Sequence, residues 1–229
     1  MSRSLAPASE PIGVAHRPLR QAVHDEVRRE IIAGRYQPGE RLYEDQIASE
    51  LNVSRNPVRE ALQALAVDGF VELEPRRGAR VARLSRRKAE DLFDVRESLE
   101  GLVARLAARR RTEEQLRQIE RHVGAGLSAV ARLELTTLPE LNTSFHQLLC
   151  EAADNPILSA ELARLSHLIE WVYSVRIFQR SSNSWAEHES IADAIAAQDE
   201  EKAFELACEH IARARAAFFD AAPIDDDGR

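Results

Sequence analysis

Three histidines lie at inward-facing positions of three different helical segments. His146 follows Asn142 by four residues, so the two side chains share one face of a helix. His188 and His210 each lie on the apolar face of a later segment. Neutral imidazoles on facing helices are one way to build a metal site in a helical bundle. The alternative is that each imidazole is a core group with a local hydrogen-bond partner, and the pattern alone leaves both interpretations open.

A second group of polar residues begins a helix that starts with a proline. The stretch "NVSRNPVREALQAL", residues 52–65, places Pro57 in the first turn, where its missing N–H costs little. We expect Ser54 to cap this helix through the N–H of Asn56, because Pro57 has no N–H to offer. Arg55 and Arg59 are then exposed at the helix start, where arginine can read guanine and serine can contact phosphate. This pattern indicates a recognition helix for the DNA major groove.

A run of basic residues follows the predicted recognition helix. Residues 75–89, "PRRGARVARLSRRKA", contain seven basic side chains and no acidic one. Arg76 and Arg77 precede Gly78 at a predicted hairpin turn, where they can lie along a phosphate backbone or enter the minor groove. We expect Glu60 to hold one of the helix arginines or the preceding helix. Arginine runs are usually solvated surface, but two such clusters on a helix and the adjacent hairpin favour DNA binding.

The elements that position these arginines are predicted within residues 18–84. A first helix at 19–34 is followed by a turn, a short helix at 44–51 and the helix at 55–68. The stretches "FVELE" and "ARVARL" flank "PRRG" and predict a β-hairpin. This order of elements is that of a winged helix-turn-helix domain.

The histidines belong to a second, purely helical part, predicted at residues 85–221. Six segments have helical periodicity, at 88–110, 113–133, 138–152, 156–179, 185–197 and 199–220. "TEEQ" at 112–115 has the spacing of a capping box. The predicted fold class is therefore mainly α, with an N-terminal winged helix-turn-helix followed by an all-helical bundle of six or seven helices.

Charge is divided unevenly between the two parts. The chain of 229 residues has a formal net charge of −7. Residues 1–85 contain 13 Lys and Arg against 12 Asp and Glu, a balance of +1, and the remainder contains 18 against 26, a balance of −8. No long apolar run predicts a membrane span, and two cysteines, Cys150 and Cys208, suit a cytoplasmic protein with free thiols. The termini, residues 1–17 and 222–229, are predicted to be disordered tails.

The N-terminal part resembles the winged-helix domain of the GntR family of bacterial transcription regulators. The resemblance covers about residues 19–83, and the core "SRNPVREAL" is similar to the family's S-R-x-P-V-R-E-A-L. It implies that Gly78 is the wing-tip glycine. It also implies DNA contacts at four positions: Ser54, Arg55, Asn56 and Arg59. Some members have an arginine in the second helix where this chain has Asp45, so we expect a different operator preference.

Residues 86–220 resemble the FCD ligand-binding domain of the FadR-type branch. The resemblance rests on "FHQLLCEAADNPIL", "EHESIADAIAAQD" and "EHI", and six helices rather than seven point to the VanR-like subgroup. Many members bind a divalent metal ion through one aspartate and three histidines. The histidines correspond to His146, His188 and His210. Zinc, nickel and manganese are the candidate ions.

The fourth metal position departs from that pattern, because Asn142 replaces the aspartate. Asparagine can ligate through its amide oxygen, but it is neutral and weaker. The resemblance therefore implies a metal site of lowered affinity whose uncompensated charge attracts an anionic effector. Cys150, one turn after His146, is a less favoured substitute ligand and more simply a small buried residue.

Two arginines, Arg96 and Arg176, lie on apolar stripes of the predicted bundle. A buried guanidinium needs an anionic partner. That partner is either an internal Asp or Glu, or the carboxylate of an effector held near the metal, as the FadR-type resemblance implies. Trp171, Tyr173 and Trp185 either line the same cavity or belong to the core.

The expected function is that of a cytoplasmic, homodimeric transcription regulator whose two winged helices read a palindromic operator in double-stranded DNA. A small carboxylate effector near the metal is expected to change the operator affinity, most simply by relieving repression. One alternative is a regulator whose bundle only dimerises. A second is a metal-dependent hydrolase, which is disfavoured because no inward Glu or Asp stands out as a general base.

Overall fold

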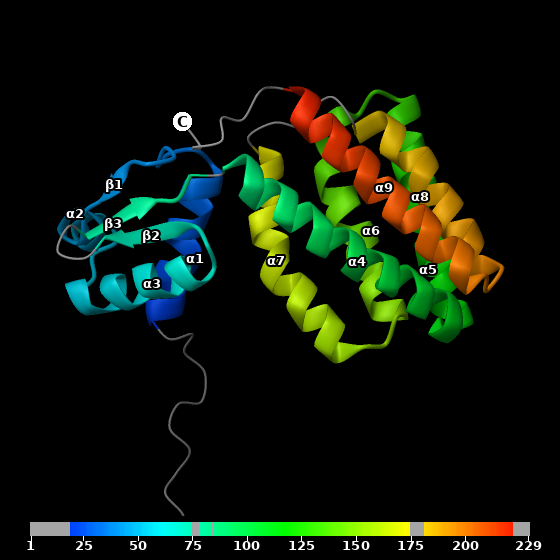
Figure 1. The fold of residues 1–229 in the computed structure, drawn as a ribbon, viewed down its shortest axis with the longest axis horizontal. Helices are drawn as coiled ribbons and strands as arrows, with labels where there is room; N and C mark the ends of the chain where they lie inside the picture. The colour runs from blue at the N-terminus through cyan, green and yellow to red at the C-terminus, as the bar shows by residue number, and fades with distance from the viewer. Residues whose placement is uncertain (1–18, 75–77, 84, 175–180, 222–229) are drawn as a thin grey trace, which may run out of the picture. The chain divides into compact units, whose positions relative to one another are not determined.

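The computed structural model describes residues 19–74, 78–83, 85–174 and 181–221 of the chain (Figure 1). The chain divides into two compact units, and the boundary lies between Ala82 and Arg83. None of the described helices combines the length and apolar character that a membrane span requires.

The first unit contains three helices and a small antiparallel sheet. The helices are α1 (Leu19–Ile32), α2 (Glu44–Glu50) and α3 (Arg55–Val67). The strands are β1 (Arg41–Leu42), β2 (Val71–Glu74) and β3 (Gly78–Val81), in the order β1-β3-β2. The predicted winged helix-turn-helix is therefore confirmed, with β2 and β3 as the wing hairpin.

The strand β1 is an addition to the predicted fold. Residues 36–42 read as a turn, yet Arg41 and Leu42 pair with Arg80 and Ala79 of β3. A strand of two residues is too short to leave an alternating pattern in the sequence, so its partner in the hairpin decides its conformation.

The core of the first unit lies between α1 and α3. Val27 and Ile31 of α1 and Val58 and Leu65 of α3 are each at most 2% exposed. Phe70, directly after the turn at Gly69, is equally buried. These contacts follow the predicted apolar stripes and fix the direction of α3, whose polar N-terminal end stays outside the core.

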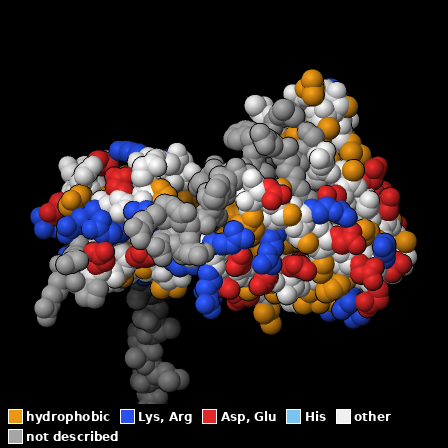
Figure 2. Space-filling model, turned by 45° about the horizontal axis from the view of Figure 1, so that its top comes forward, with side chains coloured by type: hydrophobic (Ala, Val, Ile, Leu, Met, Phe, Trp, Pro, Cys, Tyr) orange, Lys and Arg blue, Asp and Glu red, His pale blue; other side chains and the backbone are white. Residues whose placement is uncertain are grey.

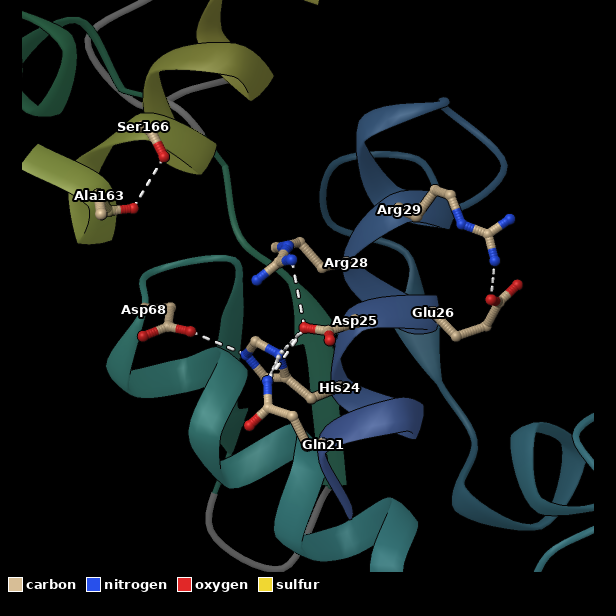
Figure 3. Close-up of polar contacts among 9 residues, drawn as sticks. All are labelled: Gln21, His24, Asp25, Glu26, Arg28, Arg29, Asp68, Ala163 and Ser166. Carbon is tan, nitrogen blue, oxygen red and sulfur yellow. Dashed lines mark hydrogen bonds and ion pairs between the residues drawn. The ribbon is translucent and has the colours of Figure 1, made fainter. Parts of the chain in front are cut away.

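Figure 3 shows how His24 joins α1 to the far end of α3. Its Nε2 lies 2.8 Å from an oxygen of Asp68, the residue that ends α3, and its Nδ1 lies 3.1 Å from an oxygen of Asp25. Gln21 donates a hydrogen bond of 3.0 Å to the same Asp25 oxygen. The buried imidazole thus ties the C-terminal end of α3 to α1.

The second unit is entirely helical in its described part. Its helices are α4 (Arg86–Arg110), α5 (Glu113–Ala131), α6 (Leu138–Ala152), α7 (Pro156–Ser174), α8 (Ser181–Ala196) and α9 (Glu200–Ala221), with a 3-10 turn η1 (Leu135–Thr137) before α6. These are the six predicted helices. The capping box is also present, because Thr112 accepts from the N–H of Gln115 and the Gln115 side chain accepts from the N–H of Thr112.

The bundle helices pack closely enough to require glycine at one crossing. α4 lies beside α9, and α5 packs against both α6 and α8 (Figure 1). A Cβ atom on Gly126 of α5 would lie 2.1 Å from the ring of Trp185 on α8. Trp185 is fully buried, so it fills the space that Gly126 leaves.

The surface of the helical unit carries both signs of charge. On the face shown in Figure 2, acidic side chains are interspersed with Lys and Arg side chains over this unit. Arg105 pairs with Glu201 at 2.7 Å, and Arg109 pairs with Glu200, so such pairs link α4 to α9. Exposed pairs of this kind contribute little to stability.

Candidate functional site

The N-terminal end of α3 presents the predicted DNA-reading residues to solvent. Ser54, Arg55, Asn56 and Arg59 are all exposed, whereas Val58 between them is buried. The expected cap is wrong, because the Ser54 side chain makes no capping hydrogen bond although its backbone has the extended N-cap conformation. Pro57 removes one of the two N–H groups that a serine N-cap can bind. The Ser54 hydroxyl therefore keeps its capacity for a phosphate contact.

Arg55 and Arg59, the two arginines predicted to read DNA, are paired with acidic residues of α2. Arg59 donates from Nε to Glu44 Oε1 at 3.1 Å and from Nη2 to Glu44 Oε2 at 2.8 Å. Arg55 pairs through Nε with Asp45. Glu60 was expected to hold one of these arginines or the preceding helix, but the carboxylates that hold them come from α2.

The wing is described on both sides of its tip. Gly78 has a φ of +91°, a conformation that residues with a Cβ rarely adopt, which agrees with its expected place at the turn. Arg76 and Arg77 lie outside the described residues, so their predicted DNA contacts stay predictions.

The three candidate metal ligands come together inside the bundle. His146 of α6, His188 of α8 and His210 of α9 offer ligand nitrogens that all lie within 4.8 Å of one another. The Nε2 atoms of His188 and His210 are 3.4 Å apart. His188 is fully buried and His210 is 4% exposed. The structure therefore brings together the three histidines that helical spacing placed on inward faces.

Two glutamates hold this cluster from outside. An oxygen of Glu100 on α4 lies 2.8 Å from Nδ1 of His146, and an oxygen of Glu187 lies 2.7 Å from Nδ1 of His210. A carboxylate on one ring nitrogen fixes the tautomer and leaves the other nitrogen as a ligand. Histidines that bind metal ions commonly have a carboxylate on the second ring nitrogen in this way.

The protonation states suit a cation as well. Burial, together with His210 and His146, lowers the pKa of His188 well below its usual range. Burial also lowers the pKa of His210 to about 4, against the effect of Glu187. Burial alone would raise the pKa of Glu100, but Arg96 and His146 hold it well below the ordinary value. Neutral imidazoles at His188 and His210, near the ionised Glu100, form a site for a positive ion.

Buried nitrogens without partners complete the test of fit. Among the described residues, Nε2 of His146 and Nδ1 of His188 are buried and make no hydrogen bond. An unsatisfied buried polar atom costs roughly 1–3 kcal/mol. The cluster at His146, His188 and His210 therefore fits a divalent metal ion better than a set of core histidines with local partners.

The structure gives less support to Asn142 and Cys150 as metal ligands. Asn142 lies one turn before His146 on α6 and is half-buried. Cys150 is also half-buried, and burial raises the pKa of its thiol to about 11, which disfavours the thiolate that a metal requires.

The buried arginine of the bundle has an internal partner. Arg96 is 4% exposed and pairs with Glu100, so Arg96, Glu100 and His146 form a continuous chain of contacts. Arg176 lies outside the described residues. Trp171 and Trp185 are both buried, and the Trp185 ring lies edge-on to His188 with centroids 4.8 Å apart.

Two family models match this chain. The model "Bacterial regulatory proteins, gntR family" matches residues 13–81, and the model "FCD domain" matches residues 91–213, more than half of the chain. The chain belongs to the GntR family and carries an FCD domain. Both resemblances inferred from the sequence motifs are thereby confirmed.

Curated relatives of this GntR-family protein are regulators. The HTH-type transcriptional repressor RspR of Escherichia coli (strain K12) is 36% identical over 137 residues, which are 60% of this chain and 60% of the repressor. The Glc operon transcriptional activator of the same strain is 33% identical over 172 residues, covering 67% of this chain and 68% of the activator. Neither the families nor these relatives are enzymes, so the hydrolase alternative has no support.

Solved structures agree on the fold. The structure of E. coli McbR/YncC has a TM-score of 0.70 at 20% identity and covers 90% of this chain and 99% of its own. A GntR regulator from Rhodococcus sp. RHA1 has a TM-score of 0.68 at 24% identity and covers 89% of this chain and 98% of its own.

Four acidic residues of the site were not predicted from the sequence. Glu44 and Asp45 contact α3 from another helix, and Glu100 and Glu187 contact histidines distant in the chain. One signal was readable beforehand, because Arg96 and Glu100 are four residues apart on one helix face. The others depend on how the helices pack.

Proposed function

We propose that this protein is a DNA-binding transcription regulator that reads a palindromic operator as a homodimer and responds to a small carboxylate at a metal-containing site. The exposed N-terminal end of α3, with Arg55 and Arg59, is the observation that carries the DNA-binding part. Membership of the GntR family supports the same function. Repression is the sign that we favour, since RspR is named a repressor.

The DNA contact is proposed to use the start of α3 in the major groove and the wing alongside it. Exposed N–H groups at a helix start favour phosphate, and the Ser54 hydroxyl lies at that point. Arg55 and Arg59 can donate two hydrogen bonds each to guanine O6 and N7. Gly78 then allows the wing turn through which Arg76 and Arg77 are proposed to meet the backbone.

The metal is proposed to be held by His146, His188 and His210, with Asn142 as a weak fourth ligand. A bound divalent ion would supply positive charge that attracts a carboxylate effector. Arg96 would contribute a second cation close to the cluster, shared between the effector and Glu100. The orphaned Nε2 of His146, whose Nδ1 pairs with Glu100, supports the metal part.

The DNA part is tested with duplexes selected from a random library by the full-length protein. Arg59→Ala is expected to lower affinity for a selected duplex roughly tenfold, because a guanine contact is lost. Arg35→Ala is a matched control, since the Arg35 and Arg59 side chains are both 55% exposed and both pair with a glutamate in the first unit. Equal affinities of the two variants for the selected duplex would show that Arg59 has no role in recognition.

The metal part is tested by measuring the metal content of protein purified without chelator. Stoichiometric metal in the parent, absent from His146→Ala and His188→Ala, is the expected result. Absence of metal from the parent after reconstitution with zinc, nickel and manganese would contradict it.

The internal partner of Arg96 favours one simpler variant of this proposal, in which the bundle binds metal but no carboxylate. A thermal-melting panel of carboxylic acids on the metal-loaded protein separates the two. A shift that Arg96→Gln abolishes supports the effector, and no shift with any acid supports the simpler variant.

A further inference from the structure

The first turn of α2 carries two acidic residues at a place where they face the recognition arginines. Glu44 and Asp45 are the first two residues of α2, which in a helix-turn-helix crosses the DNA backbone. Carboxylates there repel phosphate. They do stabilise the positive N-terminal end of α2, but such effects at exposed sites are small. Their contacts with Arg55 and Arg59 point to another role.

The contact between Glu44 and Arg59 uses one particular edge of the guanidinium. Nε donates to both carboxylate oxygens, at 3.1 Å and 3.2 Å, and Nη2 donates to one of them at 2.8 Å. The hydrogen bond from Arg59 lowers the pKa of Glu44, so this carboxylate stays charged. The edge formed by Nη1 and the outer side of Nη2 is not used by Glu44. That edge is one of the two with which arginine can bind guanine O6 and N7 together.

Arg55 is held in a related way. Its Nε pairs with Asp45, and both side chains are mostly exposed, at 65% and 62%. The terminal nitrogens of Arg55 again lie beyond the paired atom. Each of these two arginines is thus held through its Nε by a carboxylate of α2.

We propose that Glu44 and Asp45 are specificity-determining positioning residues that hold Arg59 and Arg55 with only the end-on edge of each guanidinium presented to DNA. This inference rests on the proposed DNA contacts of the two arginines. A guanine can be bound end-on while the carboxylate stays in place. A phosphate that approaches from the Nε side has to compete with a carboxylate that is already bound, and the held guanidinium cannot swing to phosphates elsewhere, so non-specific binding is weakened more than specific binding.

The test compares two duplexes of equal composition, one selected from a random library by the parent protein and one scrambled. Full-length Glu44→Gln is expected to bind the scrambled duplex more tightly than the parent does. The ratio of the two affinities is expected to fall roughly tenfold. Its binding should also depend more steeply on salt, because a released arginine is free to neutralise phosphate. Asp45→Asn is the parallel variant for Arg55.

Two further variants separate positioning from charge. Glu60→Gln removes the same charge from an exposed position of α3 next to Arg59, and its affinity ratio should match that of the parent. Glu44→Asp keeps the charge but shortens the side chain, so it should lose discrimination as Glu44→Gln does. It also decides the matter if Glu44→Gln fails to fold.

An unchanged ratio in Glu44→Asp would overturn the inference, as would equal shifts in Glu44→Gln and Glu60→Gln. The underlying DNA contact is judged separately. If Arg55→Ala and Arg59→Ala both bind the selected duplex like the parent, the recognition role itself is wrong and the inference falls with it. If Arg59→Ala loses binding and Glu44→Asp keeps discrimination, only the positioning role is wrong.

Discussion

The charge of the proposed metal site depends on position 142, where an aspartate would add a negative ligand and Asn142 adds none. Asn142 is neutral, and the nearest carboxylates, Glu100 and Glu187, bind the outer nitrogens of histidines rather than the centre of the cluster. A divalent ion there would therefore keep more of its charge than in a site with an aspartate ligand. That suits a site for an anion more than a site with a purely structural ion.

Asn142→Asp is predicted to tighten metal binding, because it adds an anionic ligand one turn before His146. The gain should reach at least the roughly tenfold change that outer-shell alterations of metal sites produce. Isothermal titration with zinc measures it. Gln147→Glu is the control, since it adds the same charge at an exposed position of the same helix. Equal affinities for Asn142→Asp and the parent would show that position 142 is not a ligand.

The sequence predicted which histidines lie together but not which glutamates bind them. His146, His188 and His210 were identified because helical spacing reports which face of a helix a residue occupies. The glutamate that binds His146 lies on α4, and the glutamate that binds His210 lies on α8. Such pairs depend on the rotation of one packed helix against another, which no local pattern records.

Helices were predicted more accurately than the small sheet. Thr112 and Pro156 mark the starts of α5 and α7 by a capping box and by a helix-starting proline, both of which act within one turn. β1 has no such signal, because its conformation comes from pairing with β3. The starts of α5 and α7 are thus determined by residues within one turn, whereas β1 is determined by a tertiary contact.

Gly126→Ala is predicted to destabilise the helical unit, because its Cβ would overlap the Trp185 ring. Overpacking of this kind costs about 1–3 kcal/mol. Gly124→Ala is a matched control on the same helix, with no atom within 4 Å of its Cβ, and should stabilise by about 0.5–1 kcal/mol through helix propensity. Urea unfolding followed by circular dichroism distinguishes them. Equal changes in the two variants would contradict the close packing of α5 on α8.

The whole molecule combines two units of different charge. Residues 1–85 have a balance of +1 and the remainder has a balance of −8. The N-terminal part is therefore nearly neutral, whereas the helical part is acidic. From this net charge we expect weak non-specific attraction of the whole protein to DNA. On the proposal above, discrimination among sequences would then rely on a few side chains such as Arg55 and Arg59.

Metal is predicted to stabilise the helical unit and leave the winged unit unchanged. A ligand at 100 times its Kd stabilises the state that binds it by about 2.7 kcal/mol. Hydrogen exchange should therefore slow in α6, α8 and α9 on addition of zinc, whereas α1 and α3 keep their rates. His188→Ala should abolish the effect. Equal slowing in both units would show that the ion acts elsewhere.

The contact between Trp185 and His188 would let the fluorescence of Trp185 report metal binding at the proposed site. The chain has two tryptophans, and the ring of this one lies edge-on to a proposed ligand, 4.8 Å away between centroids. A paramagnetic ion such as nickel would quench its emission at that range, whereas zinc with its closed shell would not. With Trp171→Phe, the remaining fluorescence would report from a single indole both whether the site is filled and which kind of ion fills it.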